Sequence, residues 1–191
     1  MYRKTHYIAT VAEKGAGKGL FVEILRKLLP EKRILMIRSS DLWKQILDVL
    51  CKEASRENMD IVATALRNAF RDDGVLNTPL MRKMKETDAD IVVLDGLRKP
   101  EEISPIKHLG GSVVFISAKP ELRFQRRKEH AEKSDERDMT FEQFVHQDDL
   151  PSNSTIRSIG ETMADARIEN NGTKKEFEAA IKKFLQDKNI S

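Results

Sequence analysis

Short aliphatic runs alternate with amphipathic stretches along the whole chain, and this alternation restricts the fold more than any other feature. The runs with the length and composition of buried strands are residues 7–12, 34–37, 91–94, 113–116 and 166–168. Apolar residues recur with a helical period in the stretches 20–29, 42–50, 57–71 and 177–185. Strands that alternate with helices predict βαβ units. We therefore expect an α/β chain with three α/β/α layers and a mostly parallel, five-stranded sheet.

Less regular segments complete this prediction. A short helix is expected over about 79–86, and a highly charged helix over about 120–133. Another helix should contain Phe141 and Phe144. Residues 151–164 are rich in Ser, Thr, Asn and Gly and favour a loop.

The charge balance excludes several classes of function. The 191 residues include 34 Lys and Arg against 31 Asp and Glu, a net charge of +3, so a broad nucleic-acid surface is not expected. No apolar run approaches the ~20 residues of a membrane span, and no signal peptide is recognised. The single Cys51 excludes an internal disulfide. We expect one cytoplasmic domain over residues 1–191, without a membrane or nucleic-acid partner, as a monomer or a homodimer.

A glycine-rich turn follows the first predicted strand and precedes a helix. Its sequence, Ala12-Glu13-Lys14-Gly15-Ala16-Gly17-Lys18-Gly19, is close to the Walker A pattern. Glycines let backbone N–H groups point at phosphate oxygens, and the start of the helix adds its positive dipole end. The alternative is an ordinary βα turn. The predicted ATP phosphate-binding residues are Lys14, Gly15, Ala16, Gly17, Lys18, Gly19 and Leu20.

Asp95 directly follows the third predicted strand, so it is expected at the same edge of the sheet as the glycine-rich turn. A carboxylate in this place is typical of a Walker B residue that holds Mg²⁺. An Asp-Gly turn without a ligand is the alternative interpretation. Mg²⁺ with ATP is therefore the expected cofactor, and Asp95 the expected metal ligand.

The Gly15-Ala16-Gly17-Lys18-Gly19 core resembles the P-loop of nucleoside monophosphate kinases of the adenylate kinase type. The resemblance runs from about Tyr7 to Leu185 and implies a P-loop NTPase fold. Such loops usually begin with Gly and have Thr after the Lys-Gly pair, where this chain has Ala12 and Leu20.

Two further segments support the resemblance. Asp95-Gly96-Leu97-Arg98 is similar to the Asp-Gly-x-Arg segment of these kinases, in which the Arg contacts the phosphate of the acceptor. Residues 164–173 resemble the Ala-Asp-x-x-Ile-x-Asn-x-Gly-(Ser/Thr) segment of dephospho-CoA kinase, which lies beside adenine. The residues assigned to adenine on this basis are Asn171 and Gly172.

The resemblance also implies an acceptor-binding helical region over about 39–88. The residues assigned to the acceptor are Arg38, Asp41, Arg56 and Arg98. Lys44 stands where related kinases have an Arg. Arg67, in the same helical stretch as Arg56, could complete a site for the acceptor phosphate. Asp41 or Ser40 could instead cap a helix, and each Arg could be a solvated surface residue; for Arg67 the two interpretations are evenly balanced.

A lid is implied over about 121–150, in which Arg123 and Arg126 resemble the arginines that close over the transferred phosphoryl group. His130 stands where a further lid Arg is common. The predicted catalytic residues are Lys18, Arg98, Arg123 and Arg126.

These features predict an ATP-dependent kinase that transfers the γ-phosphoryl group to a small nucleotide, foremost a (deoxy)nucleoside monophosphate. Dephospho-CoA kinase is a second enzymatic hypothesis. A catalytically weak nucleotide-binding protein is a third, because Ala12, Leu20, Lys44 and His130 depart from the family pattern.

Overall fold

The computed structural model describes residues 5–129, 139–149 and 151–191, without the side chains of residues 56 and 151–154. In this part of the chain the strands form one parallel sheet of order β2-β3-β1-β4-β5. The strands are β1 (His6–Ala12), β2 (Ile34–Arg38), β3 (Ile91–Asp95), β4 (Ser112–Ser117) and β5 (Ala166–Glu169). The expected α/β fold and five-stranded sheet are therefore confirmed, with every described strand pair parallel.

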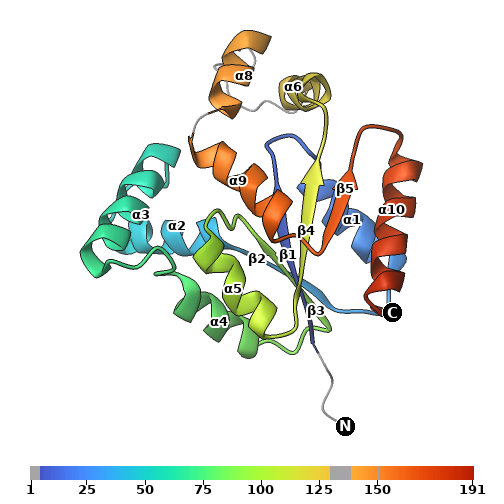
Figure 1. Cartoon of the computed structure of the whole chain (residues 1–191). Helices are drawn as coiled ribbons and strands as arrows, with labels where there is room; N and C mark the ends of the chain where they lie inside the picture. The colour runs from blue at the N-terminus through green and yellow to red at the C-terminus, as the bar shows by residue number, and fades with distance from the viewer. Residues whose placement is uncertain (1–4, 130–138, 150) are drawn as a thin grey trace.

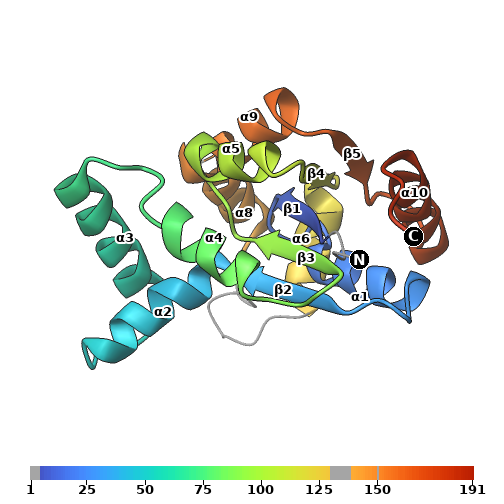
Figure 2. The same cartoon turned by 90° about the horizontal axis from the view of Figure 1, so that it is seen from below.

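Helices connect and cover the strands (Figure 1). They are α1 (Lys18–Leu28), α2 (Ser39–Val49), α3 (Arg56–Phe70), α4 (Asn77–Lys85), α5 (Pro100–His108), α6 (Pro120–Glu129), α8 (Phe141–Asp148), α9 (Pro151–Thr162) and α10 (Lys174–Asp187). α1 and α10 pack together, α5 and α9 pack on β1 and β4, and α2 and α3 project to one side (Figure 2).

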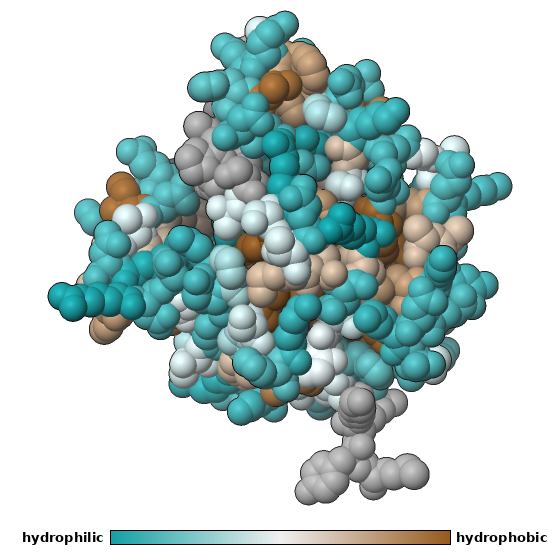
Figure 3. Space-filling view, in the orientation of Figure 1, coloured by the Kyte–Doolittle hydropathy of each residue, from teal (hydrophilic) through white to brown (hydrophobic). Residues whose placement is uncertain are grey.

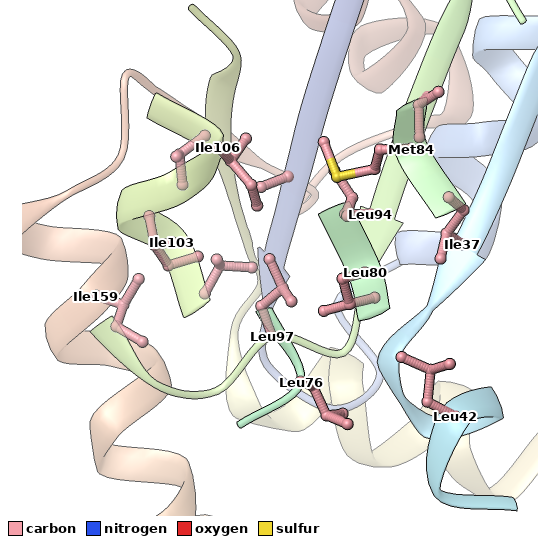
Figure 4. Close-up of a cluster of buried hydrophobic side chains, with 14 of the residues drawn as sticks. Ile37, Leu42, Leu76, Leu80, Met84, Leu94, Leu97, Ile103, Ile106 and Ile159 are labelled. Atoms are coloured by element: carbon pink, nitrogen blue, oxygen red, sulfur yellow. The ribbon is translucent and has the colours of Figure 1, made fainter. Parts of the chain in front are cut away.

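The two faces of the sheet carry separate hydrophobic clusters because successive strand residues point in opposite directions. Ile8 and Val93 pack in one cluster with α1 and α10. Ala9 and Val92 pack in the other with α4, α5 and α9, where Leu80, Ile103 and Ile159 are buried (Figure 4). Burial on both faces explains why the strand sequences are continuous aliphatic runs.

The expected loop over residues 151–164 is wrong, because α9 occupies most of this segment. Ile156 and Ile159 lie three residues apart, so both can face the sheet, and both are buried. At Gly160 an added Cβ would lie 2.4 Å from the Phe115 ring, so glycine permits the close contact with β4. Burial of this apolar stripe therefore outweighs the weak helix propensity of the polar residues around it.

Smaller points concern three other helices. α5 was not expected from the sequence, although Pro100 is at its first turn. α2 begins at Ser39 with Arg38 as N-cap and has no side-chain cap, so the alternative in which Ser40 or Asp41 caps this helix is wrong. The charged helix α6 is described over Pro120–Glu129, and residues 130–133 of that prediction lie outside the described residues.

The surface seen in Figure 3 is mostly hydrophilic, with apolar side chains in small separate areas. Large apolar residues that are exposed at α2 and α3 include Val49, Leu50, Ile61 and Phe70. In the residues that the structure describes, no helix combines the length and the hydropathy needed to cross a membrane.

Candidate functional site

The glycine-rich turn lies between the end of β1 and the start of α1, at the carboxyl edge of the sheet. Gly15 and Gly17 have φ angles of +78° and +110°, which side-chain-bearing residues rarely adopt. An added Cβ at Gly15 would lie 2.6 Å from the Arg123 carbonyl oxygen. Both the conformation and the space therefore require glycine in this turn.

Asn170, which directly follows β5, contacts the glycine-rich turn through its side chain. Its Nδ2 donates a 2.9 Å hydrogen bond to the Ala16 carbonyl oxygen, and an added Cβ at Gly17 would lie 2.4 Å from the same nitrogen. Asn170 is buried. A buried side-chain amide thus fixes the backbone of the turn directly before α1.

Lys18 and Asp95 meet at the carboxyl ends of the central strands. The Lys18 Nζ lies 2.7 Å from Asp95 Oδ1, and the exposed fractions of the two side chains are 34% and 11%. Asp95 pairs in register with Thr10 of β1 and with Arg38 of β2. The half-exposed ammonium group can therefore reach a ligand while Asp95 stays fixed in the sheet.

A cavity of about 680 Å³ opens beside the turn. Its lining residues are Glu13, Gly15, Gly17, Lys18, Gly19, Leu20, Glu23, Arg126, Asn170, Gly172 and Lys174. Of the predicted ATP-site residues, Lys14, Ala16 and Asn171 are not part of this lining. We call this space the donor cavity.

Asn171 points away from the donor cavity, since its Oδ1 accepts a 2.7 Å hydrogen bond from the Lys119 N–H. Asn170 takes the expected place beside the turn. The sequence contains the signal for it, because Asn170 is the asparagine that aligns with the Asn of the Ile-x-Asn-x-Gly pattern. For Glu23 and Lys174, which form a 2.7 Å ion pair at the same cavity, the sequence carries no comparable signal.

A second, smaller cavity of about 190 Å³ lies on the other side of Lys18. Its lining residues are Lys18, Ser39, Ser40, Trp43, Met59, Asp60, Ala63, Arg67, Asp95, Gly96, Arg98 and Glu102. It is formed by α2, α3 and the segment after β3. We call it the acceptor-side cavity.

The predicted acceptor residues are only partly brought together. Arg98 lines the acceptor-side cavity, as does Arg67. Arg38 and Asp41 instead line a separate cavity of about 520 Å³ beside β2. Arg56 is the first residue of α3, but its side chain lies outside the described part of the structure.

Buried Glu102 organises the acceptor-side cavity. Its Oε1 accepts a 3.0 Å hydrogen bond from Arg67 Nη2, and its Oε2 accepts a 2.7 Å bond from the backbone N–H of Arg98. The Arg67 guanidinium also lies 5.6 Å from the centroid of the Trp43 ring. One carboxylate therefore positions both arginines of this cavity.

The two predicted lid arginines have different surroundings. Arg126 lines the donor cavity and donates a 2.9 Å hydrogen bond to the Asn170 carbonyl oxygen. Its other terminal nitrogen, Nη1, has no hydrogen-bond partner in the described part of the chain. Arg123 is 1% exposed and is not part of the cavity lining. His130 lies outside the described residues.

Arg123 makes a bidentate ion pair with Asp148, with 2.9 and 2.6 Å between their atoms. Burial raises the pKa of Asp148, but the hydrogen bonds and charges of Arg123 and Arg157 outweigh it, so the net pKa is lowered. The pKa of Arg157 is raised, first by its hydrogen bond to Glu13. Asp148 of α8 therefore links Arg123 of α6 to Arg157 of α9.

Asp95 is the predicted metal ligand. Mg²⁺ commonly takes one or two carboxylates together with substrate phosphates and water, and Asp95 lines the acceptor-side cavity beside Lys18, the residue that lines both cavities. The residues in the described ranges contain no cluster of three or more His, Cys, Asp or Glu side chains that could hold a metal by themselves. Gly19 stands where a Walker A hydroxyl would be, so this position offers no side-chain oxygen.

No family model matches this sequence. It is 29% identical over 180 residues to a UPF0200 protein of Sulfurisphaera tokodaii, covering 94% of this chain and 95% of the relative. A UPF0200 protein of Saccharolobus islandicus is 30% identical over 168 residues, covering 85% and 83%. Another of Methanopyrus kandleri is 31% identical over 154 residues, covering 70% and 72%.

Solved structures with a similar fold include kinases of small molecules. Shikimate kinase from Bacteroides thetaiotaomicron has a TM-score of 0.58 at 15% identity, over 95% of this chain and 97% of the kinase. A gluconokinase from Sinorhizobium meliloti has a TM-score of 0.52 at 11% identity, over 97% and 96%. These likenesses show a P-loop kinase fold and do not single out the adenylate kinase type.

Proposed function

This chain belongs to the UPF0200 protein family, and from this premise and the geometry of the site we propose that it is an ATP-dependent phosphotransferase acting on a small acceptor. The observation that carries the proposal is the position of Lys18, which lines both the donor cavity and the acceptor-side cavity. Phosphoryl transfer needs the attacking and leaving oxygens in line across one phosphorus atom. Two cavities that share Lys18 would bring donor and acceptor together at one cationic group, whose charge would stabilise the transferred phosphoryl group.

Each part of the site has a role in this proposal. The loop N–H groups and Lys18 bind the donor phosphates, and Arg126 adds positive charge from the side of β5. Asn170 and Gly172 lie at the same cavity, so we assign this end to the nucleoside part of ATP. Asp95 would hold Mg²⁺, which when bound neutralises charge on the phosphates.

The acceptor is assigned to the cavity that Arg67 and Arg98 line. Their guanidinium groups suit an anionic group on the acceptor, because arginine binds phosphate and carboxylate through two parallel hydrogen bonds. We assign the helical region 39–88 to acceptor binding and the region 121–150 to a lid.

The sequence resemblance favours a (deoxy)nucleoside monophosphate as the acceptor, with dephospho-CoA as an alternative. The cavity size favours a second class, a compact hydroxy acid. At about 190 Å³ it lies below the ~300–1,000 Å³ typical of sites for drug-sized ligands. One fold neighbour is a shikimate kinase from Acinetobacter baumannii in complex with shikimate, which is such a compound.

The test is ADP formation from ATP and Mg²⁺ with a panel of acceptors: nucleoside and deoxynucleoside monophosphates, dephospho-CoA, shikimate and gluconate. One acceptor should accelerate ADP release, and its product should gain one phosphoryl group by mass spectrometry. Tight ATP binding without turnover on any of these would instead favour a nucleotide-binding protein without kinase activity. Absence of ATP binding by folded protein would contradict both.

A further inference from the structure

A group of ionic side chains that contacts the phosphate loop has no role in the proposed reaction. We call it the ion cluster; it consists of Glu13, Arg123, Asp148 and Arg157. These residues come from the loop, α6, α8 and α9 respectively. The cluster thus joins the phosphate loop to the helices on either side of residues 130–138.

The Arg123 side chain is fully engaged by protein atoms. Besides its two bonds to Asp148, Nε donates a 2.9 Å hydrogen bond to the Ala118 carbonyl oxygen, and Nη1 lies 3.4 Å from the Lys14 carbonyl oxygen. Its guanidinium also lies 5.4 Å from the centroid of the Phe144 ring. A guanidinium held on all sides cannot reach a phosphate in the donor cavity without breaking these contacts.

The cluster touches the loop at consecutive residues. Arg157 Nε donates a 2.9 Å hydrogen bond to Glu13 Oε1, and Arg123 Nη2 lies 3.5 Å from the same oxygen. Lys14 is held by its carbonyl, and the Arg123 carbonyl lies against Gly15. The residues Glu13, Lys14 and Gly15 of the phosphate loop therefore contact the ion cluster. The next two residues, Ala16 and Gly17, contact Asn170 instead.

We propose that Arg123 is a positioning residue for the donor: together with Asp148 it fixes the phosphate-loop backbone in the shape that binds ATP, and it does not contact the transferred phosphoryl group. This rests on the proposed function only in taking the donor cavity as an ATP site. It replaces the lid role that the sequence resemblance implies for Arg123.

Asp148→Asn separates the two roles because Asp148 is 5% exposed and does not line the donor cavity. If Arg123 positions the loop, loss of this charged pair should weaken ADP binding, measured by calorimetry with Mg²⁺, by about 10- to 100-fold. Arg123→Lys keeps the charge but loses the two-pronged geometry, and should weaken ADP binding in the same direction. In turnover, both variants should raise the KM for ATP and leave the KM for the acceptor unchanged.

Asp90→Asn is the matched control. Asp90 is also buried and lies near an arginine, with its Oδ2 2.8 Å from the Arg33 N–H, but at the opposite edge of the sheet. It should lower the unfolding temperature without changing ADP affinity. Each protein is measured at least 20 °C below its own unfolding midpoint, so that loss of fold is not mistaken for loss of affinity.

Equal ADP affinity in the wild-type protein and Asp148→Asn would overturn the inference alone. A higher kcat in Asp148→Asn would also overturn it, since that result would show that Arg123, once released from Asp148, acts on the phosphoryl group. If Asp148→Asn does not fold, Arg123→Lys decides in the same way. Failure of the wild-type protein to bind ADP would overturn the proposed function and, with it, this inference.

Discussion

Lys18 is the residue that lines both the donor cavity and the acceptor-side cavity. Its ammonium group lies 2.7 Å from Asp95, so a bound nucleotide has to share or replace an existing ion pair. This pair keeps the lysine in place before any ligand arrives. It also holds the ammonium group against Asp95 at the edge of the sheet, where a metal ion would be bound.

Lys18→Met should reduce ADP formation by roughly 10²–10³-fold, because it removes one preorganised positive charge from the phosphates. Lys27→Met is the control, since Lys27 lies on the same helix and pairs with Glu178 on the surface. Steady-state rates and thermal unfolding of both variants check this. Equal rates in the two variants would contradict the role of Lys18.

Asp95→Asn should abolish the effect of Mg²⁺ on nucleotide binding, since a neutral amide is a poor ligand for a hard cation. ADP affinity in the presence of EDTA should be kept or increased, because Lys18 is then free of its carboxylate partner. Calorimetric titrations with and without Mg²⁺ measure both quantities. A Mg²⁺ dependence equal to that of the wild-type protein would place the metal elsewhere.

At the scale of elements, α9 and α10 illustrate two ways in which a helix is specified. α10 has a capping box, in which Thr173 Oγ1 accepts from the Glu176 N–H and the Glu176 carboxylate accepts from the Thr173 N–H. Such local signals can be read from sequence. α9 begins at Pro151, a residue that is common at the first helical position, but the polar residues that follow favour a helix only weakly. Its existence therefore depends on burial against β1 and β4.

Gly160→Ala should destabilise the protein although alanine is the better helix former by about 1 kcal/mol. The new Cβ would lie 2.4 Å from the Phe115 ring, and overpacking of this kind costs about 1–3 kcal/mol. The expected net loss corresponds to a decrease of a few degrees in the unfolding temperature. Gly19→Ala, where nothing lies within 4 Å of an added Cβ, should not show this decrease.

Thr173→Ala should cost about 1 kcal/mol of stability at neutral pH through loss of the N-cap of α10. The pKa of Glu176 is lowered by hydrogen bonds from the Thr173 N–H and hydroxyl. A lowered pKa stabilises the fold above the usual pKa of Glu, and this contribution is lost as the pH falls through the lowered value. The difference in the free energy of unfolding between the wild-type protein and the variant, measured by urea unfolding, should therefore become smaller at low pH. Thr64→Ala, at an exposed position within α3, should show neither effect.

At the scale of the whole molecule, the net charge of only +3 does not show that charged side chains gather at one place. Lys18, Arg67 and Arg98 line the acceptor-side cavity together with Asp60, Asp95 and Glu102, so basic and acidic side chains balance there. Glu102 of α5 binds Arg67 of α3 there, and these two residues are 35 positions apart in the sequence. The cavity therefore depends on a contact between these two helices.

Arg67→Gln should raise the KM for the acceptor about 10-fold or more and leave ADP affinity unchanged, because Arg67 lines only the acceptor-side cavity. Arg38→Gln is the matched control, since Arg38 lines a different cavity beside β2. Initial rates over a range of acceptor concentrations measure the effect. A larger effect of Arg38→Gln would restore that residue to the acceptor site.

The sequence by itself determined the parallel sheet, the glycine-rich turn and the position of Asp95 beside it. These depend on local periodicity and on residues that directly follow strands, and the rules of parallel sheets bring such residues to one edge. Only the tertiary structure decided that Arg38 and Asp41 line a different cavity from Arg98, and that Arg123 is buried against Asp148. These outcomes depend on side-chain direction and on contacts between distant elements, which residue type and spacing do not specify.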